Sequence, residues 1–271
     1  MLTQAVIQQA AQEALEEVDT SILPIDPIAI AQANGITVFP NPDIPQHIDG
    51  CILRSGQSFI IGYRDTATTA GRINFTIGHE LGHYFLPGHH EALCPQDGIP
   101  HFCVPETSAN EQEMEADKFA AEILMPINIF CREMGTLDRR HGGLGTIKKL
   151  AGAFATSLTA TANRYAHNND AYCAIVVSDN ERIQYAFLSD ALKEKLEGTD
   201  SYLKGKPLSS KAIARTLLLG TSDEDQKSCC LDEWIDNAPP FDFSEEAISL
   251  GQFGRILTVL YSDDLGDDNE L

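Results

Sequence analysis

The stretch RINFTIGHELGHYFL, residues 72–86, is the most informative part of this sequence. The segment that contains it, Thr69 to Leu86, has the length of a helix, and the Pro-Gly pair that follows ends the pattern. Because His79 and His83 are four residues apart, a helix places both imidazoles on one face, where one tetrahedral zinc ion can bind both. Glu80 then faces a metal-bound water. The pattern predicts His79 and His83 as zinc ligands and Glu80 as the general base.

A hydrolytic zinc site needs a third protein ligand and a fourth position for water. His89 lies ten residues after His79, which is the third-histidine spacing of metzincins. Those enzymes have a glycine seven residues after the first histidine, and this chain has Leu86 there. The sequence therefore favours a different ligand over His89, although both alternatives remain open.

The other candidates lie on a helix predicted from Ala109 to Met125, which the capping box at residues 108–111 opens. Its apolar stripe consists of Ala116, Phe119, Ala120, Ile123 and Leu124. Glu113 falls inside this stripe, where a carboxylate is costly unless it is paired or bound to a metal, and Glu115 lies at its margin. Glu113 is thus the preferred third ligand, and Glu115 is the fallback. Asp117, one turn further on, is placed to accept the second ring N–H of a zinc-bound histidine.

The surrounding pattern predicts mixed secondary structure in the front part of the chain. Residues 3–18 and 28–33 have helical spacing, and Asp26 with Pro27 starts the second helix. A strand at 36–39 and a β-hairpin follow. The hairpin's second strand, residues 59–63, is either a sheet edge that pairs with an extended substrate or an ordinary sheet strand. Residues 89–105 are predicted to be irregular.

The character of the sequence changes near residue 168. Residues 144–166 are predicted to be helical, and strands are predicted at 172–177, 183–188 and 255–261. We expect a metallopeptidase-like domain at 1–140, a helical segment at 141–168 and a smaller C-terminal α/β domain at 169–271. The predicted fold class is α+β.

Composition limits the partners and the compartment. The net charge is −21 and the pI is about 4.6, so the surface repels phosphate backbones and direct contact with nucleic acid is not expected. No apolar run is long enough for a membrane span, and the acidic N-terminal stretch differs from a signal peptide. Seven cysteines without a CxxC pair indicate reduced thiols. We expect a cytoplasmic protein without membrane contact.

Two further patterns suggest sites, and each has a simpler explanation. The segment LAGAFATSLTATANRY, residues 150–165, has the rhythm of a helix-turn-helix, but Arg164 is the only cation on its second helix, so a packing helical hairpin is favoured over DNA contact. Histidines and cysteines between residues 89 and 103 could form a second metal site. Their spacings match no standard site, so a rim of the cleft is favoured; they are His89, His90, Cys94, His101 and Cys103.

The strings RINFTIGHELGHYFL (residues 72–86) and EMEADKFAAEILMP (residues 113–126) resemble the ImmA/IrrE family of bacterial metallopeptidases. The resemblance implies a zincin-like domain with one zinc ion, the ligands His79, His83 and Glu113, and Glu80 as the general base. The spacing of Glu113 and Asp117 is similar to the ExxxD element of gluzincins. Other divalent metals fit the same ligands. Two strings in the C-terminal part, AYCAIVVSDNERIQYAF (residues 171–187) and GQFGRILTVLYSDD (residues 251–264), resemble the GAF-like module of IrrE.

The resemblance also implies a substrate: a helix-turn-helix transcriptional repressor that is cut at one site, which relieves repression during stress. The predicted function is therefore zinc-dependent, site-specific endopeptidase activity on a protein partner. The alternative is a non-catalytic regulator, in which the metallopeptidase fold binds a repressor stoichiometrically. Both predict the same zinc site, so zinc content alone does not separate them.

Overall fold

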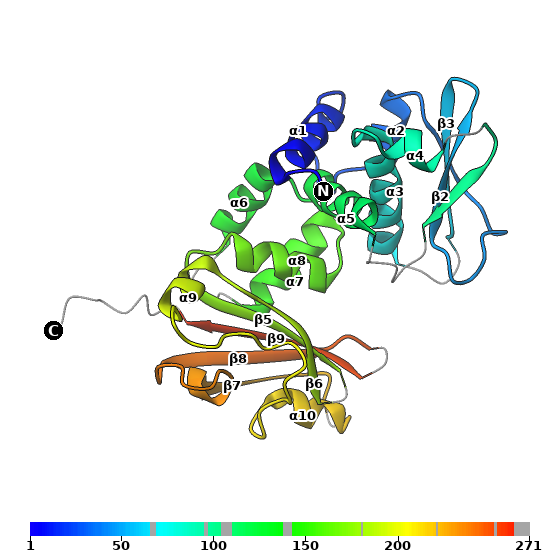
Figure 1. Ribbon diagram of the computed structural model, residues 1–271. Coiled ribbons are helices and arrows are strands. Elements are labelled where there is room, and N and C mark those ends of the chain that lie inside the picture. The colour runs from blue at the N-terminus through cyan, green and yellow to red at the C-terminus, as the bar shows by residue number, and fades with distance from the viewer. Residues whose placement is uncertain are drawn as a thin grey trace. The chain divides into compact units, whose positions relative to one another are not determined.

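The computed structural model describes residues 1–65, 69–94, 97–103, 110–137, 143–179, 181–220, 222–251 and 254–262. The chain divides into two compact units, each with its own sheet (Figure 1). The N-terminal unit comprises Met1–Arg132 and Ala151–Ser157, and the C-terminal unit comprises Glu133–Leu150 and Leu158–Leu271. The predicted mixed α+β class is confirmed. In the described ranges, no helix has the length and apolar character needed to cross a membrane.

The helices of the described residues, in chain order, are α1 (Gln4–Leu15), α2 (Pro27–Ala33), α3 (Ala70–Phe85), α4 (His89–Leu93), α5 (Glu111–Leu124), α6 (Ile127–Thr136), α7 (Leu144–Phe154), α8 (Leu158–His167), α9 (Asp190–Lys195) and α10 (Ile213–Leu218). The strands are β1 (Thr37–Pro40), β2 (Gly50–Ser55), β3 (Ser58–Tyr63), β4 (Pro100–Cys103), β5 (Tyr172–Asp179), β6 (Arg182–Leu188), β7 (Glu224–Cys230), β8 (Asp242–Ser249) and β9 (Arg255–Ser262).

The sheet of the N-terminal unit has the strand order β1-β3-β2-β4. The predicted hairpin is confirmed: β2 and β3 pair in antiparallel register, and Gly56 makes the turn with a φ of 64°. Of the two alternatives for residues 59–63, the ordinary sheet strand is confirmed and the sheet edge is excluded, because β3 pairs with β2 on one side and with β1 on the other. The edge next to β2 is β4, whose residues pair with β2 in antiparallel register.

Layers of helix cover this sheet. α3 packs on β2 and β3, α5 packs on α3, and α1 packs on α5 (Figure 1). The predicted starts of α2 and α3 hold, since Asp26 and Thr69 accept hydrogen bonds from backbone N–H groups of their first turns. α5 is capped by Asn110; Ser108 and Ala109 of the predicted capping box lie outside the described residues.

One prediction of local structure needs correction. The stretch 89–105, predicted to be irregular, contains the short helix α4 and the strand β4, which forms because β2 offers it a partner. The helical character predicted over 144–166 is confirmed as two helices, α7 and α8, separated at Ala155, which has a φ of 48°. A non-glycine residue in this left-handed conformation cannot continue an α-helix.

The C-terminal unit has an antiparallel sheet of order β6-β5-β9-β8-β7. One hydrophobic cluster joins this sheet to α9 and α10, with Leu192, Ile213 and Trp234 among its buried members. α8 packs on β5 and β6. The sequence predicted β5, β6 and β9. It did not predict β7, which is mostly exposed, or β8, whose acidic residues hide the alternation of its buried positions.

Candidate metal centre

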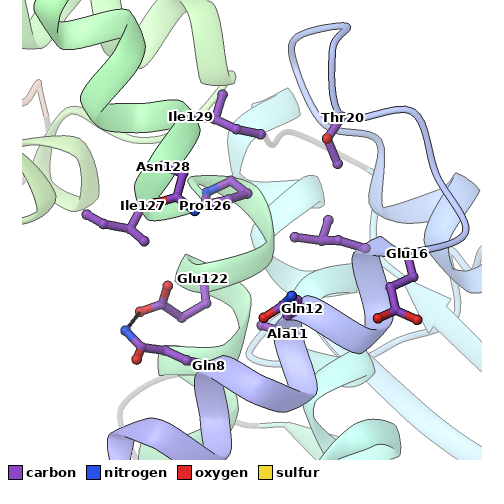
Figure 2. A pocket seen from close by; sticks show the side chains of 11 residues that line it. Gln8, Ala11, Gln12, Glu16, Thr20, Glu122, Pro126, Ile127, Asn128 and Ile129 are labelled. Atoms are coloured by element: carbon purple, nitrogen blue, oxygen red, sulfur yellow. Dashed lines mark hydrogen bonds between the residues drawn. The ribbon is translucent and has the colours of Figure 1, made fainter.

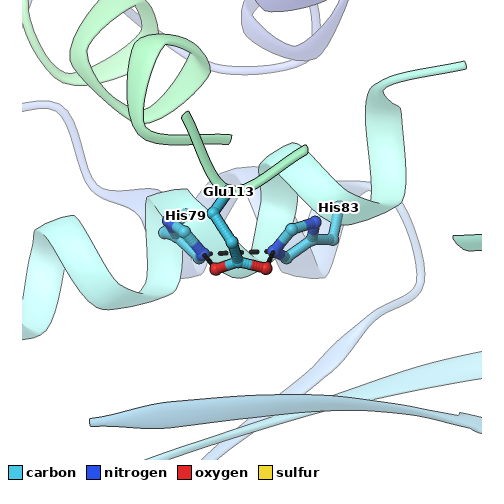
Figure 3. Close-up of side chains that lie close together, drawn as sticks. All are labelled: His79, His83 and Glu113. Atoms are coloured by element: carbon cyan, nitrogen blue, oxygen red, sulfur yellow. Dashed lines mark hydrogen bonds and ion pairs between the residues drawn. The ribbon is translucent and has the colours of Figure 1, made fainter. Parts of the chain in front are cut away.

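Two glycines let α5 approach α3 closely. A Cβ atom added at Gly82 would lie 2.9 Å from Cα of Ala116, and one added at Gly78 would lie 3.3 Å from Cβ of Ala120. The first distance is too short for real atoms, so only glycine fits at position 82. This close approach brings the first turn of α5 over the two histidines of α3 (Figure 3).

His79, His83 and Glu113 direct their donor atoms to one point (Figure 3). Nε2 of His79 lies 3.1 Å from Nε2 of His83 and 3.2 Å from Oε2 of Glu113, and Nε2 of His83 lies 3.5 Å from Oε1 of Glu113. Two donors of a tetrahedral zinc ion, each about 2.0–2.1 Å from the metal, are about 3.3 Å apart. The donor set and its spacing therefore fit a zinc ion with one position left for water.

Protonation of the metal-free site is unequal. Burial lowers the pKa of His79, but hydrogen bonds to Asp117 and Glu113 outweigh it and raise this pKa to about 10. Burial and the charge of His79 lower the pKa of His83 to about 2. Burial raises the pKa of Glu113, but His101 and His79 outweigh it and hold that pKa below its usual range. The metal-free site thus holds its proton on His79.

Each ring of the histidine pair has a partner on its other nitrogen. Nδ1 of His79 lies 2.8 Å from Oδ1 of Asp117, as the helix spacing predicted for an outer carboxylate. Nδ1 of His83 lies 3.1 Å from Nδ1 of His89, and Nε2 of His89 lies 3.0 Å from Oε2 of Glu115. In the described residues, the candidate ligand group contains neither His89 nor Glu115.

Glu80 is fully buried on the sheet side of α3. A Cβ atom added at Gly50 of β2 would lie 2.9 Å from Oε1 of Glu80, so the carboxylate lies against the backbone of that strand. Its charge also reaches His79, where it helps to raise the pKa. In the described residues Glu80 is outside the donor group and next to His79 in the chain.

The part of the chain that holds the candidate metal site matches the model of a known protein family. The family model described as "IrrE N-terminal-like domain", of a peptidase family, matches residues 31–165. These residues belong to the ImmA/IrrE family of metallopeptidases. The resemblance stated from the two motif strings is confirmed. No protein of curated function matches the chain.

The fold of the whole chain is also similar to a solved structure. A chain described as "Mycobacterium tuberculosis transcriptional regulator" matches with a TM-score of 0.61 and 14% sequence identity. The match covers 96% of this chain and 77% of that chain. At this identity the likeness concerns the fold alone.

His101 is a neighbour of the candidate metal site. The sequence suggested it only as part of a second metal site or of a cleft rim. It belongs to β4, where Nε2 lies 3.4 Å from Oε1 of Glu113 and the ring meets the edge of His83. The other residues of the suggested second metal site diverge: His90 packs on Phe59 and Tyr84, and the thiol of Cys94 faces a carbonyl oxygen of β2. The side chain of Cys103 lies outside the described residues. Only the pairing of β4 with β2 could have revealed the place of His101.

A separate cavity of about 500 Å³ lies between α1 and the start of α6 (Figure 2). Its wall includes Gln8 and Glu122, whose side chains form a hydrogen bond of 3.5 Å. No residue of the predicted zinc site lines this cavity.

Proposed function

We propose that the ImmA/IrrE domain is a zinc-dependent endopeptidase with His79, His83 and Glu113 as zinc ligands. The observation that carries this proposal is the close approach of the donor groups. The two histidine Nε2 atoms are 3.1 Å apart, and the carboxylate of Glu113 places Oε2 at 3.2 Å from His79 and Oε1 at 3.5 Å from His83, on two helices that Gly82 allows to pack closely. Membership of a metallopeptidase family supports it. The exposed fraction of the Asp117 side chain is 53%, so solvent reaches this side of the site.

A zinc ion bound there would lower the pKa of its water and polarise the scissile carbonyl group. Glu80 takes the proton of the attacking water and returns it to the leaving amine. Asp117 accepts the Nδ1–H of His79, which fixes the tautomer that leaves Nε2 free for the metal. His79 must lose its extra proton before it can act as a ligand.

The proposed substrate is a helix-turn-helix transcriptional repressor that is cut at one site. The family resemblance supports this choice, since such repressors are the typical substrates of ImmA/IrrE peptidases. The chain from Mycobacterium tuberculosis carries the description of a transcriptional regulator, and its likeness extends to the fold alone. The net charge of −21 favours a protein partner over direct contact with a nucleic acid.

The test is cleavage of the helix-turn-helix repressor encoded nearest to this gene. With zinc and a sub-stoichiometric amount of the protein, intact mass spectrometry should show two repressor fragments, and a chelator should prevent their formation. Glu80→Gln should bind zinc as the wild type does and produce no fragments, whereas Glu113→Ala should lose zinc. Fragments produced by Glu80→Gln would refute the mechanism. One-to-one inhibition of the repressor without fragments would instead identify the non-catalytic regulator.

The C-terminal unit is proposed to be a regulatory module of GAF-like type, as the resemblance of its strings to the IrrE module implies. Its five-stranded antiparallel sheet with helices on it is compatible with this proposal. The protein is proposed to act in the cytoplasm.

A further inference from the structure

A buried pair of side chains lies behind His83, on the side away from the other ligands. His89 and Glu115 are 1% and 4% exposed, and both ring nitrogens of His89 have partners, at 3.1 Å from His83 and 3.0 Å from Glu115. Glu115 also accepts the backbone N–H of Leu2. Both oxygens of the Glu115 carboxylate therefore have hydrogen-bond partners, and His89 links this carboxylate to the proposed metal ligand His83.

The turn that follows α3 places His89. Pro87 and Gly88 follow the end of α3, and Gly88 has a φ of 82°, a conformation that favours glycine. The backbone N–H of His89 then bonds to the carbonyl oxygen of Leu86, and α4 begins with His89 against His83. Gly88 lies two residues later than the corresponding glycine of metzincins. His89 accordingly contacts the far side of His83 and does not join the candidate ligand group.

The proton positions follow from the ligand role of His83. Its Nε2 faces Glu113 and His79, so Nε2 is the metal-binding atom and the neutral ring carries its hydrogen on Nδ1. Nδ1–H then donates to Nδ1 of His89. His89 must carry its own hydrogen on Nε2, which donates to Oε2 of Glu115. All three groups are satisfied in one arrangement only.

We propose that His89 and Glu115 form a positioning pair that fixes the tautomer and orientation of His83 for zinc binding. This proposal rests on the proposed zinc site. Outer partners of this type change metal affinity by about 10–100-fold when they are removed. Asp117 does this directly for His79, whereas Glu115 acts on His83 through a second histidine.

The arrangement differs from ordinary burial of a carboxylate on the same helix. Glu122 of α5 is also buried, and its side chain accepts a hydrogen bond from Gln4, far along the helix from the ligand group. Likewise His90, the neighbour of His89, packs on the rings of Phe59 and Tyr84. These two residues are matched controls, because they share the helix and the residue type with Glu115 and His89 but have other partners: Gln4 for Glu122, and the rings of Phe59 and Tyr84 for His90.

The test measures zinc affinity by competition with a chromogenic chelator, together with thermal unfolding of the metal-free proteins. His89→Leu and Glu115→Gln should each bind zinc about 10–100-fold more weakly than the wild type. His89→Gln should stay close to the wild type, because its amide can accept from His83 and donate to Glu115. His90→Leu and Glu122→Gln should bind zinc with wild-type affinity. Unchanged affinity in both His89→Leu and Glu115→Gln would overturn the pair.

A spectroscopic measurement tests the same assignment without substitutions. Long-range ¹H–¹⁵N NMR spectra of the zinc-loaded protein should show His83 with its hydrogen on Nδ1 and His89 with its hydrogen on Nε2. Zinc bound to His89, or a hydrogen on its Nδ1, would overturn the proposal even if a variant failed to fold. A wild-type protein that binds no zinc would refute the proposed function itself, whereas intact zinc binding with insensitive variants would refute the positioning pair alone.

Discussion

The N-terminal unit buries seven histidine or glutamate side chains on α3, α4 and α5, whereas the C-terminal unit buries one glutamate among its described residues. The seven include the three candidate ligands, Glu80 and the pair behind His83. The one is Glu245 of β8, which accepts the N–H of Ile213 at the start of α10 and lies 3.3 Å from Lys227.

This contrast separates two reasons for burying a charge. In the C-terminal unit the charge satisfies a helix end and a cation, so its effect is on stability. In the N-terminal unit three of the buried groups, His79, His83 and Glu113, face one another at distances that a metal ion would occupy, and a fourth, Glu115, lies 3.0 Å from a nitrogen of His89. Burial of several ionisable groups around one point is typical of a functional site.

The largest expected effect concerns the proton on His79. Because its pKa is raised to about 10, zinc must displace this proton at neutral pH. Zinc affinity should therefore rise about tenfold for each pH unit below that pKa and level off above it. Calorimetric titration in buffers of different ionisation enthalpy should show proton release on zinc binding. In Asp117→Asn the zinc affinity should level off at a lower pH, because the pKa of His79 is lower without that carboxylate. An enthalpy of zinc binding that does not depend on the buffer would contradict this prediction.

The next effect tests the close approach of the two helices. Alanine is normally a better helix former than glycine, but at Gly82 its Cβ would lie 2.9 Å from Cα of Ala116. Gly82→Ala should destabilise the protein by about 1–3 kcal/mol, as overpacking does, and weaken zinc binding by moving Glu113. Thermal unfolding and zinc titration measure both effects.

Gly152→Ala in α7 is the matched control for this substitution. A Cβ atom there meets nothing within 4 Å, so the same change should leave the stability unchanged or slightly higher. If Gly82→Ala unfolded like Gly152→Ala and bound zinc normally, the close approach would not position the site.

The smallest expected effect lies in the C-terminal unit. Glu245→Ala leaves the buried N–H of Ile213 without its partner, which should lower the free energy of unfolding by about 1–3 kcal/mol. Glu224 lies on β7 of the same sheet, and Glu224→Ala removes an exposed ion-pair partner of Lys148. This change should alter the free energy of unfolding by less than about 1 kcal/mol. Chemical denaturation measures both. Zinc affinity should stay at the wild-type value in each; a loss in Glu245→Ala would break the contrast between the two units.

Spacing along the sequence predicted the features that lie within a single helix or hairpin. The separation of His79 and His83, the place of Glu113 within the stripe of α5 and the hairpin of β2 and β3 all depend on residues close in sequence. The strands β7 and β8 escaped prediction, since Glu245 and its acidic neighbours make a buried strand look exposed. Their place depends on pairing with β9 and with each other.

The sequence by itself indicated the proposed ligands, the proposed general base and the partner of His79, because they lie on two helices whose periodicity is legible in the sequence. Only the tertiary structure decided what surrounds them. It put β4 at the sheet edge with His101 beside Glu113, and it turned His89 from a rejected ligand into the neighbour of His83. The reason is physical. β4 meets β2 and Glu113 across long stretches of chain, which only packing of the helices and the sheet brings together, and the place of His89 depends on the φ of 82° at Gly88, which spacing along the sequence does not give.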